Sequence, residues 1–339
     1  MPLVRFPQGA AAVALAALCS AAWAGEKPPR EPLGLPKIEW PKNNRYSAAK
    51  AELGRYLYYD QRISADETIS CATCHSPQFG FTDGQPVSSG INRQKGSRSA
   101  PTVINRGFSL SQFWDGRAAT LEEQVKGPMA NPIEMGNSHE MVVSTIRDIA
   151  GYRLWFAQAF GTEEVTIDRA AMAVATFERT ILSGNAPYDR YQKGDKKAMT
   201  PEQVRGMSVF FDKAKCNRCH EDSNFTLNAY NNVGIGMDKP EPDLGRYAIT
   251  KDPRDWGVFK VPTLREIEHT APYMHDGSLK TLEDVVDFYD KGGIPNQNLD
   301  PNIRKLHLTD EEKKDLVAFL KALSGEGWQQ ATPPAEFPQ

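Results

Sequence analysis

Apolar residues recur at intervals of three and four along much of the chain, and no convincing run alternates apolar and polar positions. This spacing is typical of amphipathic α-helices that bury one face. We expect helices at residues 47–58, 139–160, 166–183, 201–213, 279–289 and 310–323. The pattern therefore predicts a mainly α fold.

Two of these helices carry clear start signals. Thr200 and Gln203 form a capping box around Pro201, which stands at the first helical position. Thr309 and Glu312 form a second capping box. Both helices are therefore expected to begin at these residues.

The first 24 residues follow a different pattern. Arg5 is the only charge before an apolar run at residues 10–22, and residues 22–24 (Ala-Trp-Ala) resemble a signal-peptidase site. The run is too short to span a bilayer. It predicts a secretory signal peptide, a mature chain exported to the periplasm, and no membrane span. A lipoprotein role for Cys19 is the alternative, although a bulky residue precedes it.

The composition and length of the chain argue against a nucleic-acid-binding protein and suggest the number of domains. The chain has 339 residues, with 40 Lys+Arg against 43 Asp+Glu, so it has no basic excess that would attract nucleic acid. At about 150 residues per domain, this length suggests two domains. We expect a signal peptide at 1–24, a first domain at 25–190, and a second domain at 191–339 that ends in a tail. The polar stretch 184–199 is the best candidate for a linker.

The four cysteines outside the signal peptide fall into two identical arrangements. Each pair is followed directly by a histidine: Cys71, Cys74 and His75 in the first, and Cys216, Cys219 and His220 in the second. C-x-x-C-H is the attachment signature of a c-type haem. The two thiols bond to the porphyrin, and the histidine becomes the proximal ligand of the iron.

A four-cysteine zinc site, a redox dithiol pair and two disulfides are the alternatives. A histidine after both pairs, the export signal and the lack of surplus cysteines argue against all three. The sequence thus predicts two cytochrome c-like domains, each with one covalently attached haem.

Three further segments carry a resemblance to a known family. They are residues 113–117 (FWDGR), 128–135 (PMANPIEM) and 259–277 (FKVPTLREIEHTAPYMHDG). With both haem motifs in the same order, the chain resembles the bacterial di-haem cytochrome c peroxidase and MauG family over roughly residues 47–323. The resemblance implies that the N-terminal haem reacts with H2O2 and the C-terminal haem handles electrons.

The resemblance also implies catalytic residues near the first haem. Glu134 matches the family's distal acid, which takes a proton from H2O2 and returns it to the departing oxygen. Gln124 and Pro128 match distal-pocket positions, where a packing role is equally open. Trp114 matches the tryptophan that relays electrons between the two haems. A solvated Glu134 and a purely structural Trp114 are the alternatives.

The loop after the first haem motif departs from many peroxidases of the family. Those peroxidases carry a histidine there that blocks the first iron until the other haem is reduced. Residues 89–96 (SGINRQKG) place Ile91 at this position. Isoleucine cannot bind iron, so we expect the first haem to be open at rest.

The second haem shows another departure. The peroxidases use a methionine as its distal ligand, whereas Tyr289 stands at the matching position, as in MauG-like members. A phenolate stabilises ferric and higher states more than a neutral thioether does. We therefore expect His75, His220 and Tyr289 as iron ligands. Met274 is the competitor for Tyr289, and His275 is expected near the haems without binding iron.

The family also binds calcium between its domains. Ser99, Thr270 and Pro272 match the ligand positions, although Ser99 replaces an asparagine and is a weaker oxygen ligand. Ala214 replaces a tryptophan through which MauG passes oxidising equivalents to its protein substrate. Oxidation of a partner protein would therefore need another exit route.

The sequence predicts a periplasmic H2O2-dependent di-haem oxidase of MauG type. Such an enzyme stores two oxidising equivalents across its haems and oxidises a Trp or Tyr side chain of a partner protein. The first alternative is a peroxidase that reduces H2O2 with electrons from a small cytochrome c or cupredoxin. The second is a non-catalytic di-haem electron carrier. A monomer and a homodimer are both compatible with the sequence.

Overall fold

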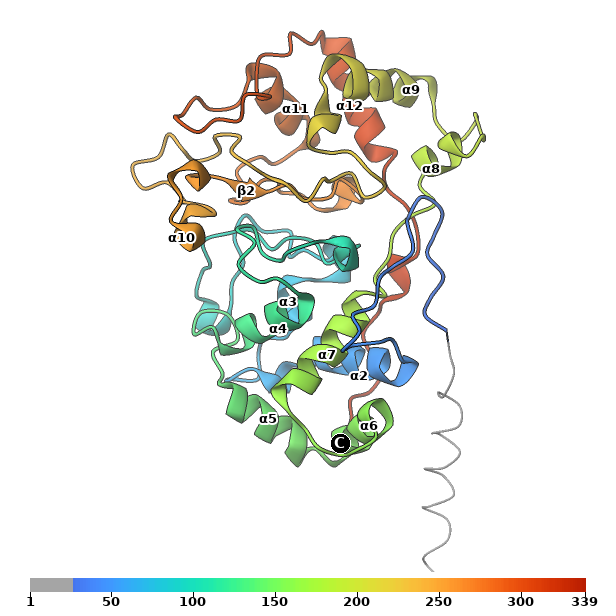
Figure 1. Cartoon of the computed structure of the whole chain (residues 1–339), viewed down its shortest axis with the longest axis vertical. Helices are drawn as coiled ribbons and strands as arrows, with labels where there is room; N and C mark the ends of the chain where they lie inside the picture. The colour runs from blue at the N-terminus through green and yellow to red at the C-terminus, as the bar shows by residue number, and fades with distance from the viewer. Residues whose placement is uncertain (1–26) are drawn as a thin grey trace, which may run out of the picture.

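The computed structural model describes residues 27–339, so the expected signal peptide at 1–24 lies outside the described residues. The described chain is mainly helical, as predicted, and its elements form two lobes along the long axis (Figure 1). Its α-helices are α2 (Ala48–Tyr59), α3 (Cys71–Cys74), α4 (Leu121–Ala130), α5 (His139–Asp148), α6 (Ala150–Phe160), α7 (Ile167–Glu178), α8 (Pro187–Gln192), α9 (Pro201–Ser208), α10 (Tyr247–Thr250), α11 (Leu282–Lys291) and α12 (Asp310–Lys321).

Shorter elements connect these helices. Strands β1 (Tyr230–Asn231) and β2 (Phe259–Lys260) pair in an antiparallel ladder, and a π-helical turn at Val209–Lys213 extends α9. Turns of 3-10 helix lie at Gln61–Ile63, Pro77–Phe79, Ile91–Arg93, Arg106–Phe108, Cys216–Arg218, Pro253–Asp255, Ile267–His269 and Trp328–Gln330. We use "first lobe" for the part that holds α2 to α7, and "second lobe" for the part that holds α9 to α12.

Each lobe is built on a close crossing of two helices. At the crossing of α2 and α7, a Cβ on Gly54 would lie 1.9 Å from the carbonyl oxygen of Ala173. At the crossing of α9 and α12, a Cβ on Gly206 would lie 1.9 Å from the carbonyl oxygen of Asp315. Since only glycine lacks a Cβ, it alone lets the backbones approach this closely. The two lobes therefore share one packing device.

The lobes also share the segment that leads into α4 and α11. An antiparallel bridge closes a turn before each helix, pairing Gln112 with Ala118 in the first lobe and Tyr273 with Leu279 in the second. Thr120 and Thr281 then cap the two helices in the same register. In this register Trp114 corresponds to His275, and Pro128 corresponds to Tyr289.

Two hydrophobic clusters form the cores of the lobes. Tyr58, Tyr152 and Phe177 belong to the first cluster, and Phe210 and Phe319 belong to the second. Both clusters draw on helices from their own lobe, so each lobe has a core of its own.

The end of the chain returns to the first lobe. Trp328 belongs to the first cluster, and Phe337 packs against it. The N–H of Gly151 in α6 donates to the carbonyl of Gln339 at 2.7 Å, and the C-terminus lies beside α6 in Figure 1. We refer to residues 328–339 as the C-terminal tail. The expected domain boundary between residues 190 and 191 stays a prediction.

Most expected helices are present, although the one expected at 166–183 ends at Glu178 and the one expected at 279–289 spans Leu282–Lys291. Three other regions differ more. The region 139–160 is two helices, because Ile149 is extended between α5 and α6. The expected linker at 184–199 contains α8, which begins at Pro187. Helix α4 was not expected, because Gly127 and Pro128 interrupt its pattern.

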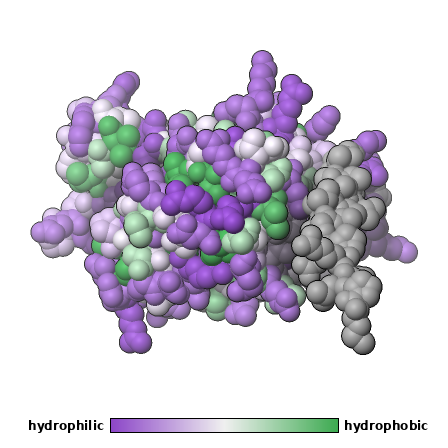
Figure 2. Space-filling view, turned by 90° about the horizontal axis from the view of Figure 1, so that it is seen from below, coloured by the Kyte–Doolittle hydropathy of each residue, from purple (hydrophilic) through white to green (hydrophobic). Residues whose placement is uncertain are grey.

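The hydropathy of the surface and the length of the helices indicate whether the described chain could cross a membrane. Seen from below, the molecule is mostly hydrophilic, with small separate hydrophobic patches (Figure 2). None of the helices within residues 27–339 combines the length and apolar content needed to cross a bilayer.

Candidate functional site

The two cysteine pairs line two different cavities, one in each lobe. Cys71, Cys74 and His75 line the first cavity, and Cys216, Cys219 and His220 line the second. Counting space open to solvent, the cavities hold about 1720 Å³ and 1810 Å³. Because the two cysteine pairs line different cavities, they cannot form a shared four-cysteine zinc site.

Each histidine that we expect as a proximal ligand is oriented by a backbone carbonyl. Nδ1 of His75 lies 3.3 Å from the carbonyl oxygen of Phe81, and Nδ1 of His220 lies 3.0 Å from that of Phe225. A carbonyl only accepts, so Nδ1 donates and the lone pair stays on Nε2, as in a metal-binding histidine. Burial lowers the pKa of both rings, that of His220 to about 4, which keeps the ligand form neutral. Together with free thiols on all four described cysteines, this arrangement fits two c-type haems.

The expected distal residues line the first cavity together: Glu134, Gln124, Pro128 and Trp114. Asn131 donates from Nδ2 to Oε1 of Glu134 at 2.8 Å, which anchors the carboxyl group. Burial raises the pKa of Glu134 above its usual 4.5, while the charge of Arg117 and the bond from Asn131 oppose this shift. Glu134 is therefore a half-buried carboxyl group. Asn131 holds its Oε1, and its Oε2 is left to exchange a proton.

Ile91 does not line the first cavity. Its side chain is 8% exposed and belongs to the first hydrophobic cluster. Its N–H donates to the carbonyl of Glu134 at 2.8 Å, which holds its loop against the distal segment. From this loop, Gly90 and Gly96 face the cavity instead.

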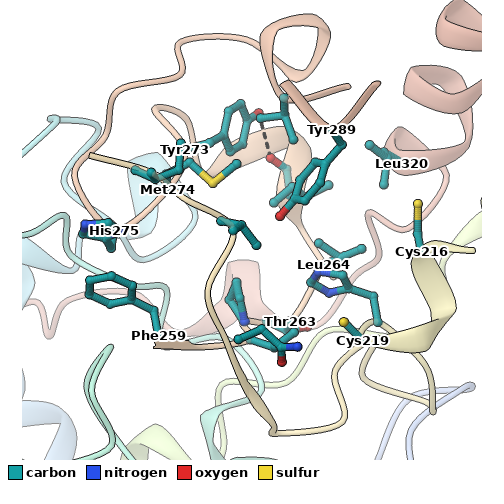
Figure 3. A pocket seen from close by; sticks show the side chains of 18 of the residues that line it. Cys216, Cys219, Phe259, Thr263, Leu264, Tyr273, Met274, His275, Tyr289 and Leu320 are labelled. Atoms are coloured by element: carbon teal, nitrogen blue, oxygen red, sulfur yellow. Dashed lines mark hydrogen bonds between the residues drawn. The ribbon is translucent and has the colours of Figure 1, made fainter. Parts of the chain in front are cut away.

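Tyr289 and Met274 both project toward the middle of the second cavity (Figure 3). Tyr289 comes from α11, and Met274 comes from the turn before it. Burial raises the pKa of Tyr289 well above its ordinary value of 10, so the free phenol is neutral. A metal that bound its oxygen would have to displace the proton.

The two cavities meet at Ser99, which lines both. The indole Nε1 of Trp114 donates to the carbonyl of Ser99 at 2.8 Å. The N–H of Ser99 donates to the carbonyl of His275 at 2.7 Å. The ring of His275 stacks on Phe259, with centroids 3.7 Å apart and planes 13° apart. Trp114 therefore lies at the junction, where it lines both cavities, and His275 lines the second cavity.

The expected calcium ligands also gather here. Ser99, Thr270 and Pro272 all line the second cavity. Within residues 27–339, no group of three or more His, Cys, Asp or Glu side chains is arranged to hold a metal ion. The calcium site stays a prediction.

Sequence analysis missed three buried charged residues at the cavity walls. Arg106 lines both cavities, Lys260 lines the second, and Glu178 lines the first. Each is at most 7% exposed. Only Lys260 carries a sequence signal, because it is a charge between the apolar residues Phe259 and Val261.

Comparisons with known proteins agree with this arrangement. A family model described as di-haem cytochrome c peroxidase matches residues 48–197. The methylamine utilization protein MauG of Methylophilus methylotrophus is 38% identical over 315 residues, covering 91% of this chain and 92% of the relative. The cytochrome c551 peroxidase of Nitrosomonas europaea is 38% identical over 309 residues, covering 89% of this chain and 87% of the relative.

A solved structure extends the likeness to the fold. The crystal structure of a MauG-like protein associated with microbial copper homeostasis superposes with a TM-score of 0.82 at 35% identity, covering 91% of this chain and 97% of that one. The chain therefore belongs to the di-haem cytochrome c peroxidase family, whose members carry two c-type haems and act on H2O2.

Proposed function

We propose that the protein is a periplasmic, H2O2-dependent oxidase of the MauG type that oxidises a Trp or Tyr side chain of a partner protein. Relatives named MauG and cytochrome c551 peroxidase are equally identical to the chain, at 38%, so identity does not choose between them. The observation that carries the proposal is Tyr289, which projects into the second cavity where the peroxidases would offer methionine.

The chemistry of the two haems determines which tasks are left to the protein chain. When bound, two c-type haems would supply cleavage of the O–O bond and the one-electron chemistry that follows. The chain itself has to admit peroxide, move its proton and set the ligands of each iron. His75, His220 and Tyr289 are the residues that would hold the irons.

Glu134 is suited to move the proton in the first cavity. Because Asn131 holds Oε1, Oε2 is left to accept a proton from one hydroxyl of H2O2 and to donate it to the other oxygen as that oxygen departs. The positive charge of Arg117 favours the carboxylate that accepts this proton. Gln124 and Pro128 would restrict how peroxide lies beside it.

The Ile91 loop supports access without prior activation. The side chain of Ile91 is packed in the core, and Gly90 and Gly96 present no side chain that could bind iron. This loop therefore supplies no iron ligand to the first cavity and leaves room for peroxide beside Glu134. A resting enzyme of this kind needs no reduction before it reacts.

Tyr289 and Trp114 would have separate roles, Tyr289 at the second iron and Trp114 between the two cavities. A phenolate from Tyr289 favours the oxidised forms of the second iron over the reduced form. Trp114 stands at the junction, and its bond to Ser99 fixes the orientation of the indole between the cavities. Calcium held by Ser99, Thr270 and Pro272 would stiffen the same junction.

The test is to mix the fully ferric protein with one equivalent of H2O2 in a stopped-flow spectrometer. The proposal predicts reaction without added reductant and a near-infrared absorption that reports two coupled irons. Reaction only after one haem is reduced would contradict it. The protein would then be a peroxidase fed by a small cytochrome c or cupredoxin. Membership of this enzyme family sets aside the non-catalytic carrier.

A further inference from the structure

Lys260 is a buried lysine that lacks an anionic partner. It lies in β2 with 4% of its surface exposed, and it lines the second cavity. Its backbone N–H donates to the carbonyl of Trp114 at 2.7 Å, which fixes its place beside the junction. Among the described residues, no carboxylate oxygen lies within 4.0 Å of its ammonium group.

Arg106 is a second buried cation at the same junction. It is 7% exposed and lines both cavities. Its Nε and Nη2 donate to Oε1 of Gln112 at 3.1 Å and 2.6 Å, and no described carboxylate pairs with it within 4.0 Å.

The carboxyl group of Glu178 does not balance this charge. It is 5% exposed, and its Oε2 has no hydrogen-bond partner. Burial raises its pKa to about 8, so it carries little negative charge at pH 7. Arg106 and Glu178 each favour the charged form of the other, but no ion pair within 4.0 Å joins them.

The two cations also act on one another and on the proximal histidines. The charge of Arg106 contributes to lowering the pKa of Lys260, after burial itself. Arg106 likewise lowers the pKa of His75, and Lys260 lowers that of His220. One cation therefore lies near each proximal ligand. Two buried like charges are costly unless anions pair with them.

We propose that Lys260 and Arg106 bind the propionate carboxylates of the haems, Lys260 that of the second haem and Arg106 those that reach the wall shared by both cavities. Propionates are the anions that a covalently attached haem brings into an apolar cavity. A cation beside a haem favours its reduced form. These two residues therefore raise the reduction potentials of the haems, and Arg106 acts on both.

The test measures reduction potentials without peroxide, so its outcome does not depend on the type of oxidase. Lys260→Met removes the charge and keeps an unbranched side chain. We expect the reduction equilibrium constant of the second haem to fall at least tenfold, which corresponds to about 59 mV for one electron. We also expect a lower melting temperature, because a propionate is left unpaired. Spectroelectrochemical titration measures the reduction equilibrium constant, and haem absorbance followed during heating measures the melting temperature.

Two controls match this variant. Lys260→Arg keeps the charge and should stay near the parent potential. Lys50→Met removes another buried lysine, which has its own partners in the side chain of Asn44 and the carbonyl of Arg45. It should leave both potentials unchanged.

The proposal would be overturned if Lys260→Met kept a reduction equilibrium constant within twofold of the parent value and had a higher melting temperature. Lys260 would then be an unpaired charge in the parent protein. If Lys260→Met does not fold with haem, Arg106→Gln decides the matter independently. It should lower the reduction equilibrium constants of both haems, and no shift in either would overturn the assignment.

Discussion

Trp114 and His275 occupy equivalent positions in the two lobes and meet through the backbone of Ser99. The indole of Trp114 donates to the carbonyl of Ser99, and the N–H of Ser99 donates to the carbonyl of His275. The shared turn before α4 and α11 thus places a different aromatic side chain at each of these equivalent positions. The backbone of Ser99, which lines both cavities, connects the two residues.

Replacing Tyr289 should identify the distal ligand of the second haem. In Tyr289→Met, a neutral thioether replaces a phenolate, so the reduction potential of that haem should rise by on the order of 0.1 V. Spectroelectrochemical titration measures the change. Tyr273→Phe is the matched control, because the hydroxyl of Tyr273 only donates to the carbonyl of Ile267 at 2.9 Å. An unchanged potential in Tyr289→Met would favour Met274 as ligand.

Removing the distal carboxylate should slow the reaction with peroxide. In Glu134→Gln, no group remains to take the proton, and the rate constant should fall by about 10²–10⁴-fold. Stopped-flow mixing with H2O2 measures this rate. Glu140→Gln, an exposed site in the same lobe, should react like the parent enzyme. Equal rates in Glu134→Gln and Glu140→Gln would show that Glu134 does not transfer the proton.

The pH profile should report the same carboxyl group. Only the carboxylate accepts a proton, so the rate should fall as pH drops through the pKa of Glu134. Burial raises that pKa, which puts the midpoint above the usual 4.5. The rate of Glu134→Gln should be flat across this range. A profile that persists in the variant would assign the titration to another group.

The close helix crossing should tolerate no side chain. Gly54→Ala puts a Cβ 1.9 Å from a backbone oxygen, so α2 and α7 must move apart. We expect a loss of about 1–3 kcal/mol in the free energy of unfolding, measured with urea. Gly127→Ala is the control, since its nearest contact would be an ordinary 3.5 Å to Phe113. Similar stability in both variants would show that the crossing can relax.

The buried ion pair of Arg265 and Asp189 should be essential to the fold. Their side chains are 1% and 3% exposed, and two parallel bonds of 2.8 Å join them. Asp189→Asn leaves a buried charge unpaired and should cost about 3–5 kcal/mol. Asp168→Asn, whose pair with Lys126 is exposed, should cost less than about 0.5 kcal/mol. Thermal unfolding of the two variants compares them directly.

Local signals predicted much of the fold. The capping boxes at Thr200 and Thr309 are present with both of their hydrogen bonds, and the helices begin where expected. A cap is decided by residues within one turn, so it can be read from neighbouring letters. The C-x-x-C-H motifs are equally local, and each motif lines a cavity in its own lobe.

Non-local contacts set the limit of prediction. The start of α6 is held by Gln339, which lies far away in the sequence, and no local pattern announces the break at Ile149. The same holds for Lys260, whose burial depends on which segments close over β2. A charge in an apolar run does not by itself reveal whether it is covered.

The returning C-terminal tail makes the order of synthesis matter. If the chain is exported starting from its N-terminus, the first haem motif reaches the periplasm well before residues 328–339 do. Until they arrive, the first lobe lacks Trp328 and Phe337, so its hydrophobic cluster stays open. An enzyme that attached haem at that stage would meet an incomplete lobe, whose cluster closes only when residues 328–339 pack onto it.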